Sequence, residues 1–199
     1  MLVVGLLGGI ASGKTLVASQ LCRLGARLLD GDRAGHEALR QADVIDAVRR
    51  RWGDKVFDAQ GNIDRRKLAG IVFAGTTESH ADLEYLESLT HPKIVETLRR
   101  QADQLQAAGT PVAVLDAAVM LKAGWRAMCD KILFIEAPRS QRMGRAQERG
   151  WSQEDFEARE AAQESLDAKR GLADLVIDNS GSPERTYAQV EKFWHSLGS

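Results

Sequence analysis

The chain has 199 residues, of which 44% are hydrophobic and 28% are charged, and its formal net charge is -1. This length suits one domain with a sizeable core, and the near-neutral charge gives no indication of binding to nucleic acid or an anionic membrane. The 2 cysteines and 4 histidines show no metal-ligand spacing, so we expect reduced thiols and no zinc site. No apolar run approaches about 18 residues and no basic leader is visible, so we expect a cytoplasmic protein without a membrane span.

Five short apolar runs alternate with long segments of helical character. The runs cover residues 2–7, 26–29, 112–115, 132–135 and 175–177. Continuous apolar runs of this length, joined by helices, are typical of parallel strands that are buried on both faces. The sequence therefore predicts an α/β protein in which helices flank a five-stranded parallel sheet.

The segment that contains the end of the first predicted strand and the residues after it reads GLLGGIASGKTLVA. It fits the P-loop pattern Gly-x4-Gly-Lys-Thr at Gly8, Gly13, Lys14 and Thr15, between a strand and a helix as that motif requires. The glycines let successive N–H groups turn toward phosphate oxygens, and the helix N-terminus favours the same negative charge. We expect Lys14 to reach the β- and γ-phosphates and the Thr15 hydroxyl to hold Mg²⁺. A glycine-rich turn that binds nothing is the alternative.

The predicted nucleotide-phosphate site comprises Gly8, Gly9, Ala11, Ser12, Gly13, Lys14, Thr15 and Leu16. The methyl group of Ala11 is compatible with a nearby phosphate if the φ angle of that residue is negative. A P-loop does not identify the acceptor of the phosphate. The chain has no N-K-x-D segment for reading guanine, so a small kinase is favoured over a GTPase.

Two carboxylates follow the second predicted strand, in the segment Leu29-Asp30-Gly31-Asp32. Ligands of open α/β sheets gather at the carboxyl ends of the strands. Both carboxylates could therefore face one cleft, where a positioned carboxylate would serve an acceptor hydroxyl. A solvated turn, in which Asp-Gly is common, is the alternative.

Together with the P-loop, four further segments resemble the dephospho-CoA kinase family, in the order and spacing of that family. They are LLDGDRAGHEAL, the stretch from Asp64-Arg65 to Val72-Phe73, Leu86-Glu87 before His91-Pro92, and ADLVIDNSG. The resemblance runs nearly end to end. It implies transfer of the ATP γ-phosphate to the 3′-hydroxyl of dephospho-CoA, the final step of CoA biosynthesis. ATP and Mg²⁺ would be the cofactors, and the protein would be a monomer or weak homo-oligomer.

The resemblance also implies the organisation of the chain. Residues 1–199 would form a single domain with a three-layer P-loop NTPase-type fold. Its core would cover about 1–34, 110–138 and 172–199. A helical acceptor-binding insertion would span about 35–109, and a lid about 139–171.

Roles follow from the same resemblance. Asp32 would orient or deprotonate the 3′-hydroxyl, with Lys14 and Arg145 as the other catalytic residues. Mg²⁺ would lie on Thr15 and Asp116, although an aspartate at the end of a strand can equally cap a turn. The residues expected to contact the acceptor are Asp30, Asp32, His36, Arg65, Leu68 and His91.

For two histidines of this set, a role without ligand contact is an alternative. His36 could equally be a surface residue on the helix after the second strand. His91 precedes Pro92, so a helix is expected to end there, and a role in stabilising that turn is equally plausible.

Arginines recur after Pro138 at Arg142, Arg145 and Arg149, on one face of a predicted helix. A solvated basic stripe is one interpretation. In a kinase lid, such arginines stabilise the charge of the transferred phosphoryl group and exclude water. We favour the lid for Arg145 and Arg149, the second as a nucleotide contact.

Two further stretches resemble the family near the C-terminus. Asn179 and Gly181 would lie beside the adenine of ATP. Gln163 with Lys169 or Arg170 matches a Q-x5-K stretch that returns from the lid, without an assigned role.

The segment after the third strand departs from the family. It lacks the expected proline, and Lys122 stands where a glutamate is usual. Lys122 is the only feature that favours a nucleotide-binding protein without catalysis. Another small-molecule P-loop kinase, for a nucleoside monophosphate or a sugar, is the second alternative, and the Asp30-Gly31-Asp32 segment followed by His36 argues against it.

Overall fold

The computed structural model describes residues 1–116, 120–121, 123–161 and 163–198, except for the side chain of Asp32. Lys122 therefore lies outside the described residues. The chain divides into two compact units, one formed by Met1–Leu29 with Ala102–Ser199 and the other by Asp30–Gln101.

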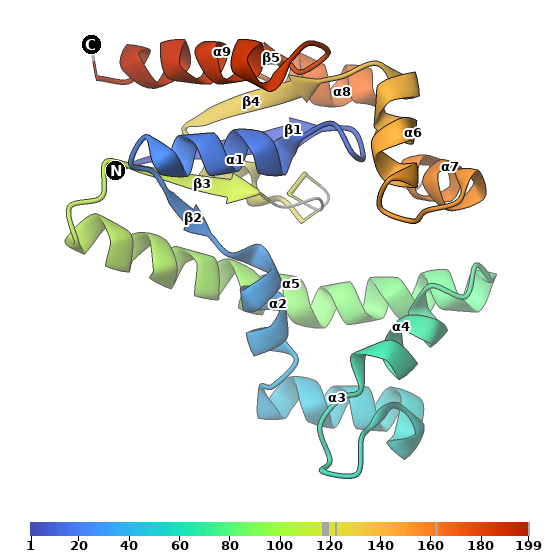
Figure 1. Ribbon diagram of the computed structural model, residues 1–199. Helices are drawn as coiled ribbons and strands as arrows, with labels where there is room; N and C mark the ends of the chain where they lie inside the picture. Colours follow the sequence, from blue (N-terminus) through green and yellow to red (C-terminus); the bar gives the residue numbers. More distant parts are fainter. Residues whose placement is uncertain (117–119, 122, 162, 199) are drawn as a thin grey trace. The chain divides into compact units, whose positions relative to one another are not determined.

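The first unit is built on a five-stranded sheet with the order β2-β3-β1-β4-β5, in which all neighbouring strands are parallel (Figure 1). Its strands are β1 (Leu2–Gly8), β2 (Arg27–Leu29), β3 (Val112–Asp116), β4 (Lys131–Glu136) and β5 (Leu175–Asp178). The five predicted strands and their parallel arrangement are confirmed. In the central strand, Leu6 pairs with Asp116 and Gly8 with Ile135, so the carboxyl ends of three strands lie along one edge.

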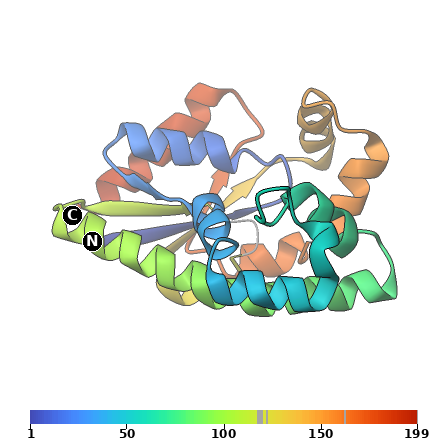
Figure 2. The ribbon, with the colours of Figure 1, turned by 90° about the horizontal axis from the view of Figure 1, so that it is seen from below.

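Helices cover both faces of this sheet. On one face, α1 (Lys14–Arg23) and α9 (Pro183–Ser196) lie side by side (Figures 1 and 2). Their buried side chains recur at helical spacing, as at Val17 and Leu21, and meet alternate strand residues such as Val4 and Leu6 in one core cluster. The other face of β1 packs against α8 (Leu166–Gly171).

Two helices, α6 (Arg139–Gln147) and α7 (Gln153–Ala161), pack on each other in the segment that follows β4. Pro138 is the N-cap residue of α6, one position before the first helical turn. Phe156 of α7 and Ala146 of α6 are fully buried and pack against Ala11 of the P-loop. This cluster joins the two helices to the loop after β1.

The second unit is helical. It contains α2 (Gly31–Ala38), α3 (Ala42–Trp52), a 3-10 turn (Gly53–Val56), α4 (Arg65–Val72) and most of α5 (Thr77–Ala107). Its core is an apolar cluster from α3, the 3-10 turn and α4, with Trp52 and Tyr85 in edge-to-face contact at 5.7 Å. None of the described helices combines the length and the apolar character that crossing a membrane requires.

The prediction that a helix ends at His91 is wrong, because α5 continues through Pro92. Proline removes one backbone donor and costs a helix about 3 kcal/mol or more. The helix has buried side chains on both sides of the proline, including Thr90, Ile94 and Leu98, and their packing offsets that cost.

The central strand requires glycine at position 5. A Cβ there would lie 2.7 Å from Cδ1 of Ile132, 2.8 Å from Sγ of Cys129 and 3.0 Å from Sδ of Met120. Burial raises the pKa of the Cys129 thiol to about 11, so the group is neutral at pH 7 and packs as an apolar side chain. The space over Gly5 is therefore filled by three buried neighbours.

We expect the substitution Gly5→Ala to lower the free energy of unfolding by about 1–3 kcal/mol, because a tightly packed core accepts an added methyl group only by distortion. Urea denaturation measures this change. Gly144→Ala in α6 is the matched control, since its added methyl meets no atom within 4 Å, and alanine there is expected to be neutral or stabilising by up to about 1 kcal/mol. Equal stability of the two variants would contradict the packing described for β1.

Candidate active site

The P-loop connects the end of β1 to the start of α1, and its backbone requires residues without side chains. Gly13 is the N-cap of α1, with φ 105°, and a Cβ there would collide with the amide of Asn179. A Cβ on Gly8 would lie 2.7 Å from the carbonyl oxygen of Ile135. The two glycines of the motif therefore stand where the loop passes closest to other parts of the unit.

Side chains from distant segments hold the carbonyl groups of the P-loop. Asn179 donates from Nδ2 to the Ser12 carbonyl at 2.7 Å, and Arg145 donates from Nη1 to the same oxygen at 3.2 Å. Arg142 donates from Nη1 to the carbonyl of Ile10 at 3.5 Å. In a planar trans peptide, the N–H of the next residue points away from the carbonyl. These contacts therefore turn the N–H groups of Ala11 and Gly13 to the opposite side of the loop, where an anion would bind.

Lys14 lies against the same loop. Its Nζ donates to the carbonyls of Gly9 at 3.2 Å and Gly8 at 3.5 Å. Burial lowers the pKa of Lys14, the charge of Asp116 raises it, and the charges of Arg142 and Arg149 lower it further. Positive charge is thus concentrated beside N–H groups at a helix N-terminus, which is the environment that favours a phosphate.

The backbone of Ala11 does not have the negative φ angle that the sequence analysis required for a methyl group near a phosphate. Its φ angle is 56°, the left-handed region that costs most L-residues about 1–2 kcal/mol. Ala11 is only 8% exposed and packs with Ala146 and Phe156. Packing against α6 and α7 therefore stabilises Ala11 in this conformation in spite of its positive φ.

The oxygen groups predicted to hold Mg²⁺ lie at the two expected element ends. Thr15 is exposed in the first turn of α1, and Asp116 is the last residue of β3, partly buried. A hydroxyl and a carboxylate are hard oxygen donors that suit Mg²⁺. Within the described ranges, no group of three His, Cys, Asp or Glu residues is placed to hold a metal ion. The residues present fit an ion that is shared with the phosphates of a nucleotide.

Of the three arginines that the sequence analysis placed on one helix face after β4, two are bound within the protein and the third is exposed. Arg142 is 3% exposed, and its guanidinium pairs with Glu160 at 2.7 Å. Arg145 donates from Nη2 to the carbonyl of Asn179 at 2.9 Å, in addition to its P-loop contact. Arg149 follows α6 and is exposed. The sequence analysis favoured Arg145 and Arg149 over Arg142 as functional arginines. The burial of the Arg142 charge depends on tertiary contacts, which the sequence pattern does not reveal.

Asn179 is buried, and its side chain makes hydrogen bonds within the protein through both of its polar atoms. Besides the bond to Ser12, its Oδ1 accepts a hydrogen bond from the Thr186 hydroxyl at 2.9 Å. A Cβ on Gly181 would lie 3.2 Å from the Arg185 side chain. The described contacts of Asn179 support the P-loop, and contact of Asn179 or Gly181 with adenine stays a prediction.

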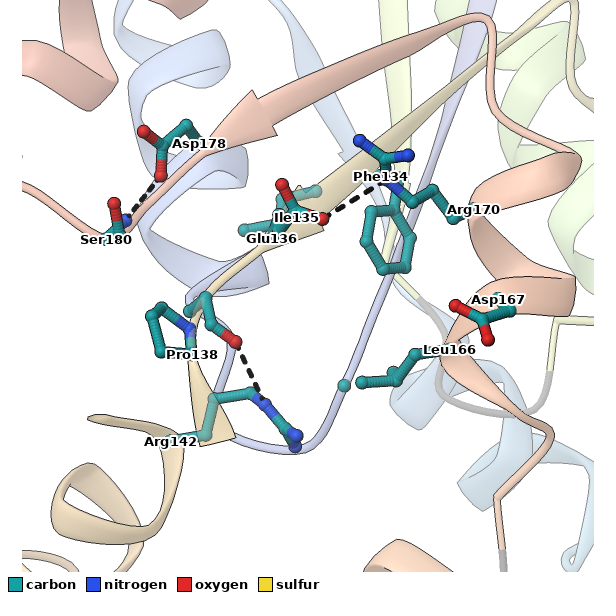
Figure 3. A pocket seen from close by; sticks show the side chains of 12 residues that line it. Phe134, Ile135, Glu136, Pro138, Arg142, Leu166, Asp167, Arg170, Asp178 and Ser180 are labelled. Carbon is teal, nitrogen blue, oxygen red and sulfur yellow. Dashed lines mark hydrogen bonds and ion pairs between the residues drawn. The ribbon is translucent and has the colours of Figure 1, made fainter. Parts of the chain in front are cut away.

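A cavity of about 500 Å³ borders the P-loop at Gly9 (Figure 3). Arg142 of α6 lines one part of the cavity, and Asp167 and Arg170 of α8 line another. Residues at the ends of β4 and β5, including Glu136 and Asp178, complete the lining. Glu136 at the end of β4 pairs with Arg170 at 3.1 Å. The wall of the cavity therefore combines charged groups of both signs with apolar side chains such as Phe134 and Leu166.

The residues predicted to bind the acceptor lie in the second unit. Asp30 is the N-cap of α2, where its Oδ1 accepts a hydrogen bond from the Arg33 N–H at 2.8 Å, and the Asp30 N–H donates to Oε1 of Gln101 at 3.0 Å. Asp32 is the second residue of α2. The Asp-Gly segment is thus the start of a helix, which the preference of aspartate for the N-cap position could have indicated.

The other predicted acceptor contacts differ in exposure. Arg65 begins α4 and is exposed, whereas Leu68 is 2% exposed and belongs to the core of the unit. His36, in α2, and His91, in α5, are both partly buried. A contact of any of these residues with an acceptor stays a prediction.

The strand, glycine turn, lysine and helix of the first unit define the class: this is a P-loop nucleotide-binding protein of the α/β type. The sequence matches the profile described as dephospho-CoA kinase over residues 2–184. The chain therefore belongs to the dephospho-CoA kinase family.

Individual relatives agree with this family. The dephospho-CoA kinase of Aquifex aeolicus is 37% identical, with 98% of this chain and 96% of that protein aligned. The dephospho-CoA kinase of Symbiobacterium thermophilum is 37% identical over 98% of this chain and 81% of that protein. The crystal structure of TT1252 from Thermus thermophilus superposes with a TM-score of 0.81 at 29% identity, covering 98% of this chain and 97% of the other.

We expect Asn179→Ala to weaken ATP binding by up to about tenfold, because the Ser12 carbonyl loses its shorter side-chain hydrogen bond and more of the loop must be ordered when ATP binds. Isothermal titration with ATP measures the change. Thr186→Val is the matched control, since it removes the hydroxyl that donates to Asn179 Oδ1 and keeps the contact of Asn179 with Ser12. An ATP affinity that is the same in Asn179→Ala as in the parent protein would refute the supporting role.

Proposed function

We propose that this chain transfers the γ-phosphoryl group of ATP to the 3′-hydroxyl of dephospho-CoA, yielding CoA and ADP. The observation that carries the proposal is the family match over residues 2–184, together with a complete P-loop. We also propose that the protein works with Mg²⁺, in the cytoplasm, as a monomer or weak homo-oligomer.

The first unit supplies the groups that bind the donor. The N–H groups of the P-loop and the Lys14 ammonium would bind the β- and γ-phosphates. Arg142 and Arg145 keep the loop in the binding conformation through its carbonyl groups. Mg²⁺, held by Thr15 and Asp116, would neutralise charge on the β- and γ-phosphate oxygens.

The second unit would supply the acceptor carboxylate. The 3′-oxygen forms a bond to the γ-phosphorus, the bond from that phosphorus to the bridging oxygen breaks, and ADP leaves with the electron pair. Asp32 would orient the 3′-hydroxyl and accept its proton late in the transfer. Asp30 is engaged as the cap of α2, so its role would be to fix the turn that carries Asp32.

The first test is phosphate transfer from ATP and Mg²⁺ to dephospho-CoA, with formation of CoA as the readout. We expect a kcat above about 1 s⁻¹, the low end for ordinary enzymes. Adenosine, AMP, shikimate and gluconate serve as rival acceptors, because a different small-molecule kinase would prefer one of them. ATP binding without transfer to any acceptor would favour a protein without catalysis, and Lys122→Glu would then be tested for recovery.

The substitution Asp32→Asn is expected to lower kcat by roughly 100-fold or more while ATP affinity stays nearly unchanged. Asp30→Asn is the matched control, because asparagine is as good an N-cap residue as aspartate and keeps α2 in place. Steady-state kinetics and ATP titration of both variants measure the difference. A parallel loss of ATP affinity in Asp32→Asn would place this carboxylate on the metal instead.

A further inference from the structure

Lys169 is a buried cation that the donor site described above does not use. Lys169 lies on α8 and is 4% exposed. In the part of the chain that the structure describes, its ammonium makes one hydrogen bond, to the neutral Oε1 of Gln163 at 2.9 Å. Lysine is rarely buried to this extent without a carboxylate partner, since desolvation of the charge is costly.

The position of α8 places Lys169 next to the P-loop. Leu166, one turn earlier on the same helix, has its Cδ2 only 3.2 Å from the position that a Cβ on Gly9 would occupy. Residues three apart share a helix face, so Leu166 and Lys169 both face the body of the unit. The helix itself packs against β1, the strand that leads into the P-loop.

The charges around Lys169 are mostly positive. Burial lowers its pKa, the charge of Lys14 lowers it further, the charge of Glu164 raises it, and the charge of Arg142 lowers it. Glu164 is exposed, so its charge is screened by water. Arg142 is already paired with Glu160. Among the residues that the structure describes, two lysines therefore share one region and no carboxylate pairs with Lys169. A polyanion would supply the missing negative charge.

We propose that Lys169 is a second phosphate-binding lysine of the donor site, which binds the β- and γ-phosphates of ATP together with Lys14. Gln163 positions the ammonium while leaving its charge unneutralised. This inference rests on the proposed use of a nucleoside triphosphate, and does not depend on which acceptor receives the phosphate.

The test compares binding of ATP and AMP by isothermal titration to the full chain. Lys169→Met retains the length and the burial of the side chain and removes its charge. We expect ATP affinity to fall about 10- to 100-fold, the value of one or two charge-assisted hydrogen bonds. AMP, which lacks the β- and γ-phosphates, is expected to bind within about twofold of the parent protein. Lys169→Arg should recover most of the ATP affinity.

Gln163→Glu gives a second, independent measurement in case Lys169→Met does not fold. A carboxylate at this position would pair with the ammonium inside the protein. We expect a higher melting temperature together with weaker ATP binding, because the lysine charge is then satisfied without a ligand. Lys192→Met is the control for loss of a lysine, since Lys192 is exposed on α9.

The outcomes separate this inference from the proposed function. ATP affinity that is unchanged in both Lys169→Met and Gln163→Glu would overturn the role of Lys169, even if the parent protein forms CoA. Equal losses of ATP and AMP affinity would also overturn it, because they indicate general damage to the site. Selective loss of ATP affinity would support it even if dephospho-CoA proved to be the wrong acceptor.

Discussion

The donor site depends on one constraint, the binding of the P-loop carbonyl groups by side chains from elsewhere in the unit. A glycine-rich loop is flexible by composition, because its residues have few conformational restrictions. Asn179 and Arg145 both bind the Ser12 carbonyl, and Arg142 binds that of Ile10. These bonds fix the direction of the peptide groups before any ligand arrives, so less ordering entropy is lost when an anion binds.

The strand order makes this arrangement possible. Because β4 lies directly beside β1 and β5 beside β4, the segments that follow these two strands emerge next to the P-loop. Arg142 and Arg145 come from α6 after β4, and Asn179 follows β5. Residues that are more than 130 positions apart in the chain are thereby brought within hydrogen-bond distance.

Ala11 connects the same loop to α7 by apolar packing. Its left-handed backbone costs about 1–2 kcal/mol, and burial of one methyl group returns about 0.8 kcal/mol. Phe156, its neighbour in the cluster, also lies beneath the guanidinium groups of Arg139 and Arg142, at 5.4 and 5.7 Å from the ring centre. Packing and cation–π contacts thus hold the loop and the two helices as one assembly.

The sequence was sufficient for the sheet and the P-loop, because apolar runs and glycine spacing are local signals. It was insufficient where a tertiary contact decides the outcome. Pro92 does not end α5, because packing on both sides outweighs one lost hydrogen bond. The burial of Leu68 likewise depends on side chains from several elements of the second unit, and its contact with an acceptor stays a prediction. The φ angle of Ala11 depends on neighbours in α6 and α7, which no local pattern in the loop reveals.

The cations around the P-loop divide by chemistry. The fork of an arginine suits several fixed acceptors at once, and Arg142 binds two carbonyls and a carboxylate. Lysine carries a compact charge on a flexible stem, and Lys14 and Lys169 rest on neutral oxygens of Gly9 and Gln163. An arginine engaged in this way maintains the loop whether or not a ligand is present. A lysine on a neutral oxygen keeps its charge available, and it can exchange that weak partner for a phosphate without breaking an ion pair.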